Sequence, residues 1–296
     1  MNPTSAVGPP GRVTVIGLGN MGRPMAACLA RAGYQVTGYD IVPAARERFA
    51  GEGGRTADDA GAAAADAEVV ITLLPDGKAV RDAIAMLRPH LKPGAILIDM
   101  SSSAPLGTRA LGEELIAAGF GFIDAPVSGG VKRAIDGTLA IMVGGAADTI
   151  DRAEPVLAAM GKTIFRTGKL GTGHAMKALN NYVSAAGLVA AVEALAIGAQ
   201  FGLDSAIMVD VLNASTGRNN STENKLKQFV IPETFNSGFS LALMAKDIRT
   251  ADELAHALGL TTPLADEITR LWSSAEQSAG SGADHTEIGR FLAAPR

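Results

Sequence analysis

Two polar residues interrupt an apolar, alanine-rich segment and could carry out proton transfer. Lys177 and Asn181 stand four positions apart within residues 174–201, which contain no proline and predict one long helix. Side chains at this spacing share one face of a helix. If burial and nearby positive charge lower the pKa of the lysine, its neutral amine can take a proton near neutral pH. The helix pattern alone favours the other interpretation, in which the lysine stem lies along the surface and its ammonium reaches water.

A glycine-rich motif follows the first predicted strand, residues 13–16, and precedes a helical pattern. The motif reads Gly17-Leu18-Gly19-Asn20-Met21-Gly22. In this pattern the first glycine allows a tight turn, the second lets the backbone approach a diphosphate, and the third permits close packing of helix on strand. The diphosphate then binds free N–H groups at the positive end of a helix. A glycine-rich turn without a ligand is the alternative.

An acidic residue closes the second predicted strand, residues 35–39. Asp40 lies 18 residues after Gly22, close to the ~20 residues at which dinucleotide-binding folds place a carboxylate. Such a carboxylate accepts hydrogen bonds from the adenosine ribose and repels a 2′-phosphate. The sequence therefore predicts NAD as cofactor, with NADP less favoured. Arg46 and Arg48 either moderate this preference or lie on a solvated helix face.

Short β-rich runs alternate with helical stretches in the first half of the chain. The runs are residues 13–16, 35–39, 69–73, 95–98, 121–124, 139–143 and 163–166. Most are nearly continuously apolar, as expected of strands covered on both faces. Their alternation with helices predicts an α/β fold of Rossmann type, with a doubly wound, mostly parallel sheet.

The strand pattern ends at a glycine-rich segment, residues 167–173. After the long helix we expect further helices around residues 204–213, 240–258 and 263–278. The predicted organisation is a flexible lead (1–11), a NAD-binding domain (12–167) and an all-helical domain for substrate binding and oligomerisation (168–296). The long helix is more apolar than a small helical domain requires, so we expect it to pack against another subunit in a homodimer or homotetramer.

The composition excludes several classes of protein. With 296 residues, of which 47% are apolar and 19% charged, the chain is globular and long enough for two domains. Its net charge of −4 gives no general attraction to nucleic acid or anionic membranes. We see no apolar run approaching the ~20 residues of a membrane span, so a cytoplasmic location is expected. The single cysteine, Cys28, is predicted to be a buried thiol, and the four widely separated histidines predict no metal site.

Several ordered motifs resemble the β-hydroxyacid dehydrogenase family, which includes 3-hydroxyisobutyrate dehydrogenases, tartronate semialdehyde reductases and phosphogluconate dehydrogenases. The similarity runs over roughly residues 12–292. Besides the glycine motif, the matching segments are Leu73-Leu74-Pro75, Asp99-Met100-Ser101-Ser102-Ser103-Ala104-Pro105, Asp124-Ala125-Pro126-Val127-Ser128-Gly129-Gly130, Lys177-Ala178-Leu179-Asn180-Asn181 and Leu243-Met244-Ala245-Lys246-Asp247. The segments ending at Gly130 and Asn181 are the most specific, because both are present and in the family's order.

The resemblance implies a role for each motif in transferring a hydride between a hydroxy acid and nicotinamide. Lys177 would accept the hydroxyl proton and return it in the reverse reaction, while Asn181 would orient the hydroxyl. Ser128 and the backbone N–H groups of Gly129 and Gly130 would bind the substrate carboxylate. The remaining matches imply cofactor contacts for Leu73, Leu74, Pro75, Ser102 and Lys246, and a place in the substrate pocket for Asp247.

Two departures from the family pattern bear on the substrate. Arg133 stands where family members often have glycine, so it either pairs with a second anionic group of the substrate or lies on the surface. Asn220 stands where they often have tryptophan, which favours a substrate more polar than 3-hydroxyisobutyrate, such as an aldonate or a glycerate-like acid.

Two other functions are compatible with the same fold. An NADPH-dependent reductase of semialdehydes or imines is disfavoured by Asp40 and, for imines, by Lys177, which imine reductases resembling this family usually replace. A non-catalytic dinucleotide-binding protein is disfavoured because Lys177 and Asn181 are both present.

Overall fold

The structure is a computed structural model that describes residues 5–280 and 282–293. The chain divides into two compact units, Met1–Lys177 and Ala178–Arg296. Each unit has hydrophobic clusters of its own. The division falls within the long helix α8 (Thr172–Phe201), whereas the predicted domain boundary lies at the end of the preceding strand.

The first unit is built on one sheet, whose described strands are β1 (Arg12–Ile16), β2 (Gln35–Tyr39), β3 (Arg55–Thr56), β4 (Val69–Thr72), β5 (Ile96–Asp99), β6 (Gly121–Asp124), β7 (Val127–Ser128), β8 (Leu139–Gly144) and β9 (Gly161–Gly168). Their order is β3-β2-β1-β4-β5-β6-β8-β7, with β9 beside β8. The pairs from β3 to β6 are parallel, and β8 is antiparallel to both β6 and β7. The predicted Rossmann-type sheet is thus confirmed. Only β3 and β7 were not predicted, because two residues are too few to show a pattern.

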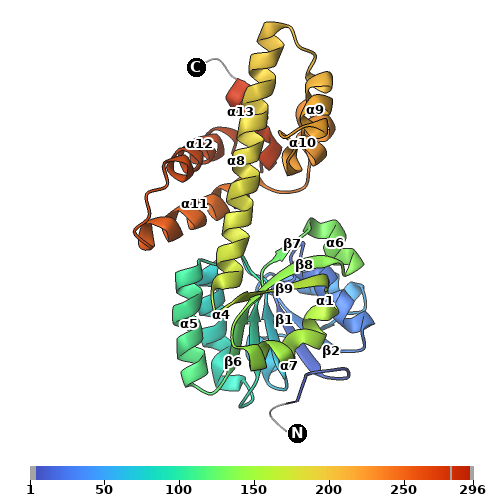
Figure 1. The fold of residues 1–296 in the computed structure, drawn as a ribbon. Coiled ribbons are helices and arrows are strands. Elements are labelled where there is room, and N and C mark those ends of the chain that lie inside the picture. Colours follow the sequence, from blue (N-terminus) through green and yellow to red (C-terminus); the bar gives the residue numbers. More distant parts are fainter. Residues whose placement is uncertain (1–4, 281, 294–296) are drawn as a thin grey trace. The chain divides into compact units, whose positions relative to one another are not determined.

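Alternate side chains of the central strands enter two different cores, which explains why these strands are almost wholly apolar. Ile96 and Ile98 pack in the core formed with α1 (Gly22–Arg31), α6 (Gly130–Asp136) and α7 (Ala147–Ala158). Leu97, between them, packs in the core formed with α3 (Ala60–Ala64), α4 (Gly77–Leu87) and α5 (Pro105–Ala117). Figure 1 shows α1 and α5 on opposite sides of the strands. The unit is completed by α2 (Pro43–Gly51) and η1 (Arg88–His90).

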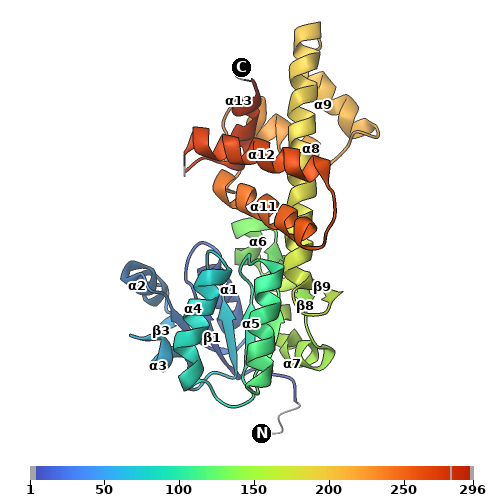
Figure 2. The same ribbon diagram turned by 90° about the vertical axis from the view of Figure 1, so that its left-hand side faces the viewer.

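The regular elements described in the second unit are all helices, as predicted, apart from one isolated bridge between Ser240 and Asp284. After α8 come α9 (Ser205–Ala214), α10 (Asn220–Asn224), the π-helix η2 (Leu226–Val230), α11 (Leu241–Ala257), α12 (Pro263–Ala279), η3 (His285–Glu287) and α13 (Ile288–Ala293). Figure 2 shows α11 and α12 lying side by side. Their apolar faces pack around Trp272, which is fully buried. The short elements α10, η2 and α13 are too brief to be predicted from periodicity.

Helix α8 corrects one expectation. Its most apolar 18 residues have a mean hydropathy of 1.7, so by length and composition it could cross a membrane, although no such segment was expected. Alanine, valine, leucine and isoleucine raise this mean, and charged residues are few in the helix. This is weak evidence for a span, since core helices of soluble proteins share the same composition.

Two smaller predictions concern the N-terminal segment and Cys28. Of the predicted flexible lead, residues 1–4 lie outside the described residues, while the backbone of Val7 is hydrogen-bonded to Arg152 O and to the Tyr34 hydroxyl. The later part of the lead is therefore attached to the unit. Cys28 is buried as predicted, with its Sγ 3.2 Å from Ala134 O.

Candidate active site

The register of the sheet aligns the carboxyl ends of its central strands. Ile16 pairs with both Tyr39 and Thr72, Thr72 with Asp99, and Asp99 with Asp124. The segments that follow these strands carry the predicted cofactor residues of the first unit. In open α/β sheets ligands bind at this edge, so the register gathers these residues where a dinucleotide would lie.

The three motif glycines face different surroundings. A Cβ on Gly17, whose φ is +98°, would lie 2.3 Å from Leu73 O, and a Cβ on Gly22 would lie 1.8 Å from Gly17 O. Both positions thus need glycine for the fold itself. A Cβ on Gly19 would meet nothing within 4 Å. The fold does not require glycine there, whereas a diphosphate bound against this backbone would. Leu18, Asn20 and Met21 complete the turn into α1.

Asp40 holds the glycine motif against the end of β2. Its carboxylate oxygens accept hydrogen bonds from Leu18 N and from Val42 N, both at 2.8 Å. A carboxylate has about four lone-pair sites, so ribose hydroxyls can still be accommodated. Arg46 donates to the backbone oxygen of Asp40 and lies over the ring of Tyr39, while Arg48 bonds the backbone of its own helix.

The segments after β4 and β5 are joined by buried polar contacts. Leu74 N donates to Ser101 Oγ at 2.9 Å, which links the segment Leu73-Leu74-Pro75 to the turn that carries Ser102. That turn is held by Asp99, which is 1% exposed and accepts hydrogen bonds from Thr72 Oγ1, Ser101 N and Ser103 Oγ.

The predicted carboxylate-binding loop follows β7. Gly129 and Gly130 have φ values of +133° and +69°, which L side chains rarely adopt, so both glycines are needed for the turn into α6. Ser128 is partly exposed beside them. Arg133 is exposed, packs its stem against Gly129 and lines a pocket of about 350 Å³ with Thr138, Ala140, Lys162 and Thr163.

A buried carboxylate fixes the start of α8, a feature that sequence reasoning missed. Asp124 is fully buried and accepts hydrogen bonds from Gly171 N and His174 N at 2.7 and 2.8 Å. Burial raises the pKa of Asp124, although His174 and these backbone bonds oppose the shift. The His174 ring is itself held between Thr108 Oγ1 and Ser101 O. The only sequence signal was the spacing of His174, three residues before Lys177.

Lys177 and Asn181 lie on one face of α8, as their spacing predicts. Lys177 is partly buried and belongs to the first unit, whereas Asn181 is buried and belongs to the second. Asn181 Nδ2 donates to Asp247 Oδ2 at 2.6 Å, and Lys246 Nζ lies 3.4 Å from Asp247 Oδ1. The second unit thus brings Asn181 together with Asp247, which lies 66 residues later in the sequence, and with its neighbour Lys246.

Asn220 is the exposed first residue of α10. The start of this helix contacts α8. Ser221 Oγ donates a hydrogen bond to Ser184 O at 3.5 Å, and a Cβ on Gly187 would lie 3.4 Å from the Asn219 side chain. Asn219 closes a capping box with Thr222.

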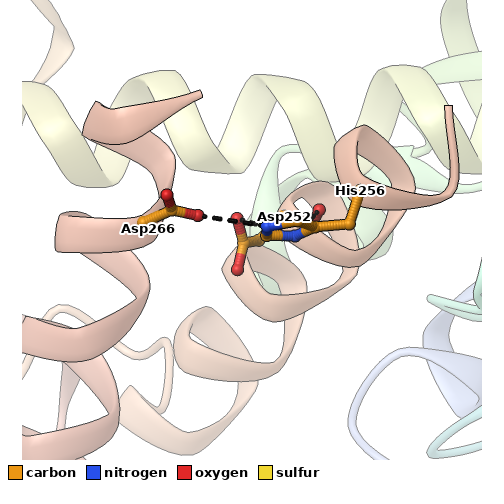
Figure 3. Close-up of side chains that lie close together, drawn as sticks. All are labelled: Asp252, His256 and Asp266. Atoms are coloured by element: carbon orange, nitrogen blue, oxygen red, sulfur yellow. Dashed lines mark hydrogen bonds and ion pairs between the residues drawn. The ribbon is translucent and has the colours of Figure 1, made fainter. Parts of the chain in front are cut away.

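Three residues outside the predicted site gather between the end of α11 and the start of α12 (Figure 3). One ligand atom from each of Asp252, His256 and Asp266 lies within 4.8 Å of the others, a spacing that could hold a cation. The His256 ring already lies 3.4 Å from Asp266 Oδ1 and 3.6 Å from Asp252 Oδ1. These contacts between the ring nitrogens and the two carboxylates account for the arrangement, so we assign no metal to it.

Comparison with known proteins agrees with this geometry. Residues 12–168 match the family described as the NAD binding domain of 6-phosphogluconate dehydrogenase. Residues 171–292 match the family described as NAD-binding of NADP-dependent 3-hydroxyisobutyrate dehydrogenase. The chain belongs to the β-hydroxyacid dehydrogenase family. As a member of this family it is an oxidoreductase with an NAD-binding Rossmann domain.

Relatives within this dehydrogenase family match along most of the chain. A 3-hydroxyisobutyrate dehydrogenase of Pseudomonas aeruginosa is 38% identical, with 93% of this chain and 96% of the relative covered. An NAD-dependent L-serine dehydrogenase of the same organism is 34% identical, with 86% and 88% covered. The solved 3-hydroxyisobutyrate dehydrogenase of Mycobacterium tuberculosis, with L-serine, is 34% identical with a TM-score of 0.90, and 96% of this chain and 99% of that chain are covered.

Proposed function

We propose that the protein oxidises a small β-hydroxy acid with NAD⁺, and that Lys177 accepts the hydroxyl proton. The observation that carries this proposal is the support given to α8 on either side of Lys177. Three residues before it, His174 is locked in a buried polar network. Four residues after it, Asn181 is locked on Asp247. Residues that must be held in a fixed geometry for catalysis need such supporting contacts.

The glycine motif fits a dinucleotide. Gly17 and Gly22 are required by the fold, but open space at Gly19 leaves the backbone accessible to the diphosphate. Asp40 would bind the ribose and disfavour a 2′-phosphate, so NAD is preferred over NADP. Leu73, Leu74, Pro75 and Ser102 lie on the segments that follow the neighbouring strands, and Lys246 is proposed as a further cofactor contact. When bound, the nicotinamide supplies the acceptor for the hydride.

Side chains and backbone groups of the protein would transfer the hydroxyl proton and bind the substrate carboxylate. The Lys177 amine would take the O–H proton of the alcohol as the carbonyl forms, while the hydride of the C–H bond would leave for the acceptor named above. Asn181, positioned by Asp247, would orient the hydroxyl. Ser128 with the N–H groups of Gly129 and Gly130 would bind the substrate carboxylate. The exposed amide of Asn220 supports a polar substrate, and the names of two relatives, which specify 3-hydroxyisobutyrate and L-serine, support a short β-hydroxy acid.

A homodimer or homotetramer in the cytoplasm completes the proposal. Large apolar side chains on α8 and α9 are exposed in the single chain, including Val183 (66%), Ile197 (72%), Phe201 (86%) and Ile207 (64%). Exposed apolar surface of this extent is typical of subunit contacts. Contacts with nucleic acid or membranes are not part of the proposal.

The test is NAD⁺ reduction across a panel of small hydroxy acids, including 3-hydroxyisobutyrate, L-serine, D-glycerate and L-threonate. Lys177→Met should lower turnover by about 10²–10⁴-fold while NADH binding is retained. Lys169→Met, which changes an exposed lysine just before α8, is the control and should leave turnover unchanged. A Lys177→Met enzyme that keeps more than a tenth of the native turnover would contradict the assigned role.

A further inference from the structure

One lysine of the second unit differs from the other basic residues of that unit. The lysines and arginines described between residues 178 and 293 are Arg218, Lys225, Lys227, Lys246, Arg249, Arg270 and Arg290. All except Lys225 have a carboxylate oxygen within 4.0 Å. Among these described residues, Lys225 is therefore the one cation without an ion-pair partner.

The surroundings of Lys225 leave its ammonium without a counter-charge in contact. The side chain is about half-buried, and this burial lowers the pKa of Lys225, while Asp284 opposes the shift. The Asp284 carboxylate is already engaged by hydrogen bonds from Ser237 Oγ, Gly238 N, Thr286 N and Thr286 Oγ1. The neighbouring His285 has its pKa lowered to about 4 by burial and by Lys225, so its ring is neutral at neutral pH. A partly desolvated ammonium without an ion-pair partner favours the binding of an anion from outside the protein.

The helix geometry places Lys225 on the side of α10 that meets α8. Lys225 N donates to Ser221 O, so the two side chains are one turn apart on the same face. Ser221 Oγ contacts α8 at Ser184 O, and Ser184 follows Asn181 by three residues on the same helix. Lys225 thus lies one turn after the residue through which α10 contacts α8, and that contact is three residues after Asn181 along α8.

The backbone fixes this position. Lys225 O accepts hydrogen bonds from both Phe229 N and Val230 N, at 2.9 and 3.3 Å, where α10 passes into the π-helix η2. The next residue, Leu226, is fully buried in the core. Short π-helical segments are frequent at functional sites, and here the segment holds a cation on a rigid support.

We propose that Lys225 binds a second anionic group of the substrate, so that the preferred substrates are β-hydroxy acids carrying a further carboxylate or comparable oxyanion. This inference rests on the proposed function and names its substrate class. The ammonium would replace lost hydration with a charge-assisted hydrogen bond to that group, which selects the diacid over the corresponding monoacid.

Two acids with the same reacting end test the inference. 3-Hydroxyisobutyrate and 2-(hydroxymethyl)glutarate share the hydroxymethyl and carboxylate groups, but the second acid also carries a distal carboxylate. Lys225→Met keeps most of the side-chain volume without the charge, Lys225→Arg keeps the charge, and Lys227→Met changes an exposed neighbour. We expect Lys225→Met to lower kcat/KM for the diacid by about 10- to 100-fold and for the monoacid by less than threefold. Lys225→Arg should retain part of the preference, and Lys227→Met all of it.

Binding and stability measurements separate the possible failures. Calorimetric titration of 2-(hydroxymethyl)glutarate into the protein saturated with NADH measures the Kd for the diacid, which Lys225→Met should raise. This measurement does not need turnover. If Lys225 matters for binding but no acid is oxidised, only the proposed function fails. Lys225→Met should be at least as stable as the native protein in urea, because no ion pair is lost. Equal losses with both acids, diacid binding that is indifferent to Lys225, or marked destabilisation by Lys225→Met would overturn the inference.

Discussion

Alanine at Gly19 and alanine at Gly22 are expected to separate cofactor binding from folding. The two residues lie three positions apart in one motif, and the added atom is the same. At Gly22 the new methyl group would lie 1.8 Å from Gly17 O, and Gly17 is itself held by the hydrogen bond from its N–H to Tyr39 O at 2.8 Å. At Gly19 the methyl group would meet no protein atom within 4 Å.

The expected magnitudes follow from these distances. Relieving the contact at Gly22 requires a movement of more than about 1 Å between α1 and the turn, and overpacking of this kind costs about 1–3 kcal/mol or more. Gly19→Ala should leave the free energy of unfolding unchanged or raise it by up to about 1 kcal/mol, because Gly19 does not have a positive φ. Its methyl group would displace the cofactor diphosphate and cost at least one charge-assisted hydrogen bond, about 1.5–3 kcal/mol. The Kd for NADH should therefore rise about 10- to 150-fold.

Urea unfolding measures the first quantity and calorimetric titration with NADH the second. Gly22→Ala should shift the unfolding midpoint downwards, whereas Gly19→Ala should keep the native midpoint and lose affinity. If Gly19→Ala bound NADH within threefold of the native protein, or were as destabilised as Gly22→Ala, the placement of the diphosphate at this turn would be wrong.

Two further predictions concern charge. Asp40→Ser should lower the ratio of kcat/KM for NAD⁺ over NADP⁺ at least 30-fold, about 2 kcal/mol. The substitution removes both a ribose acceptor and a charge that repels the 2′-phosphate. An unchanged ratio would show that Asp40 only holds Leu18 N. The folded-state pKa of His285, about 4, lies below the ordinary 6.5 because the ring is buried, so the folded form binds its proton less readily than the unfolded form. The associated stability is complete above pH 6.5 and is lost as the pH falls towards 4, by at most about 3 kcal/mol. Urea unfolding of His285→Gln should therefore show a shallower acid dependence than that of the native protein, and an unchanged dependence would contradict this reasoning.

The alternation of apolar runs predicted the sheet because each central strand is covered on both faces, as Ile96 and Leu97 illustrate. It did not predict β3, β7, α10 or η2, which are too short to produce a period. The candidate site was predicted only as a set of motifs. No pattern indicated that Asp124 would accept hydrogen bonds at the start of α8 or that Asn181 would bond Asp247.

The sequence by itself determined the fold class and the family, and it supplied the candidate residues for cofactor binding and proton transfer. These features depend on local information, namely the period of apolar residues, the glycine spacing and the four-residue step from Lys177 to Asn181. Tertiary structure alone decided which polar groups find partners. His174 meets a carboxylate 50 positions away, and Asn181 meets one 66 positions away. Lys225 meets none among the described residues of its unit, and it is this lack of a partner, invisible in the sequence, that points to the substrate.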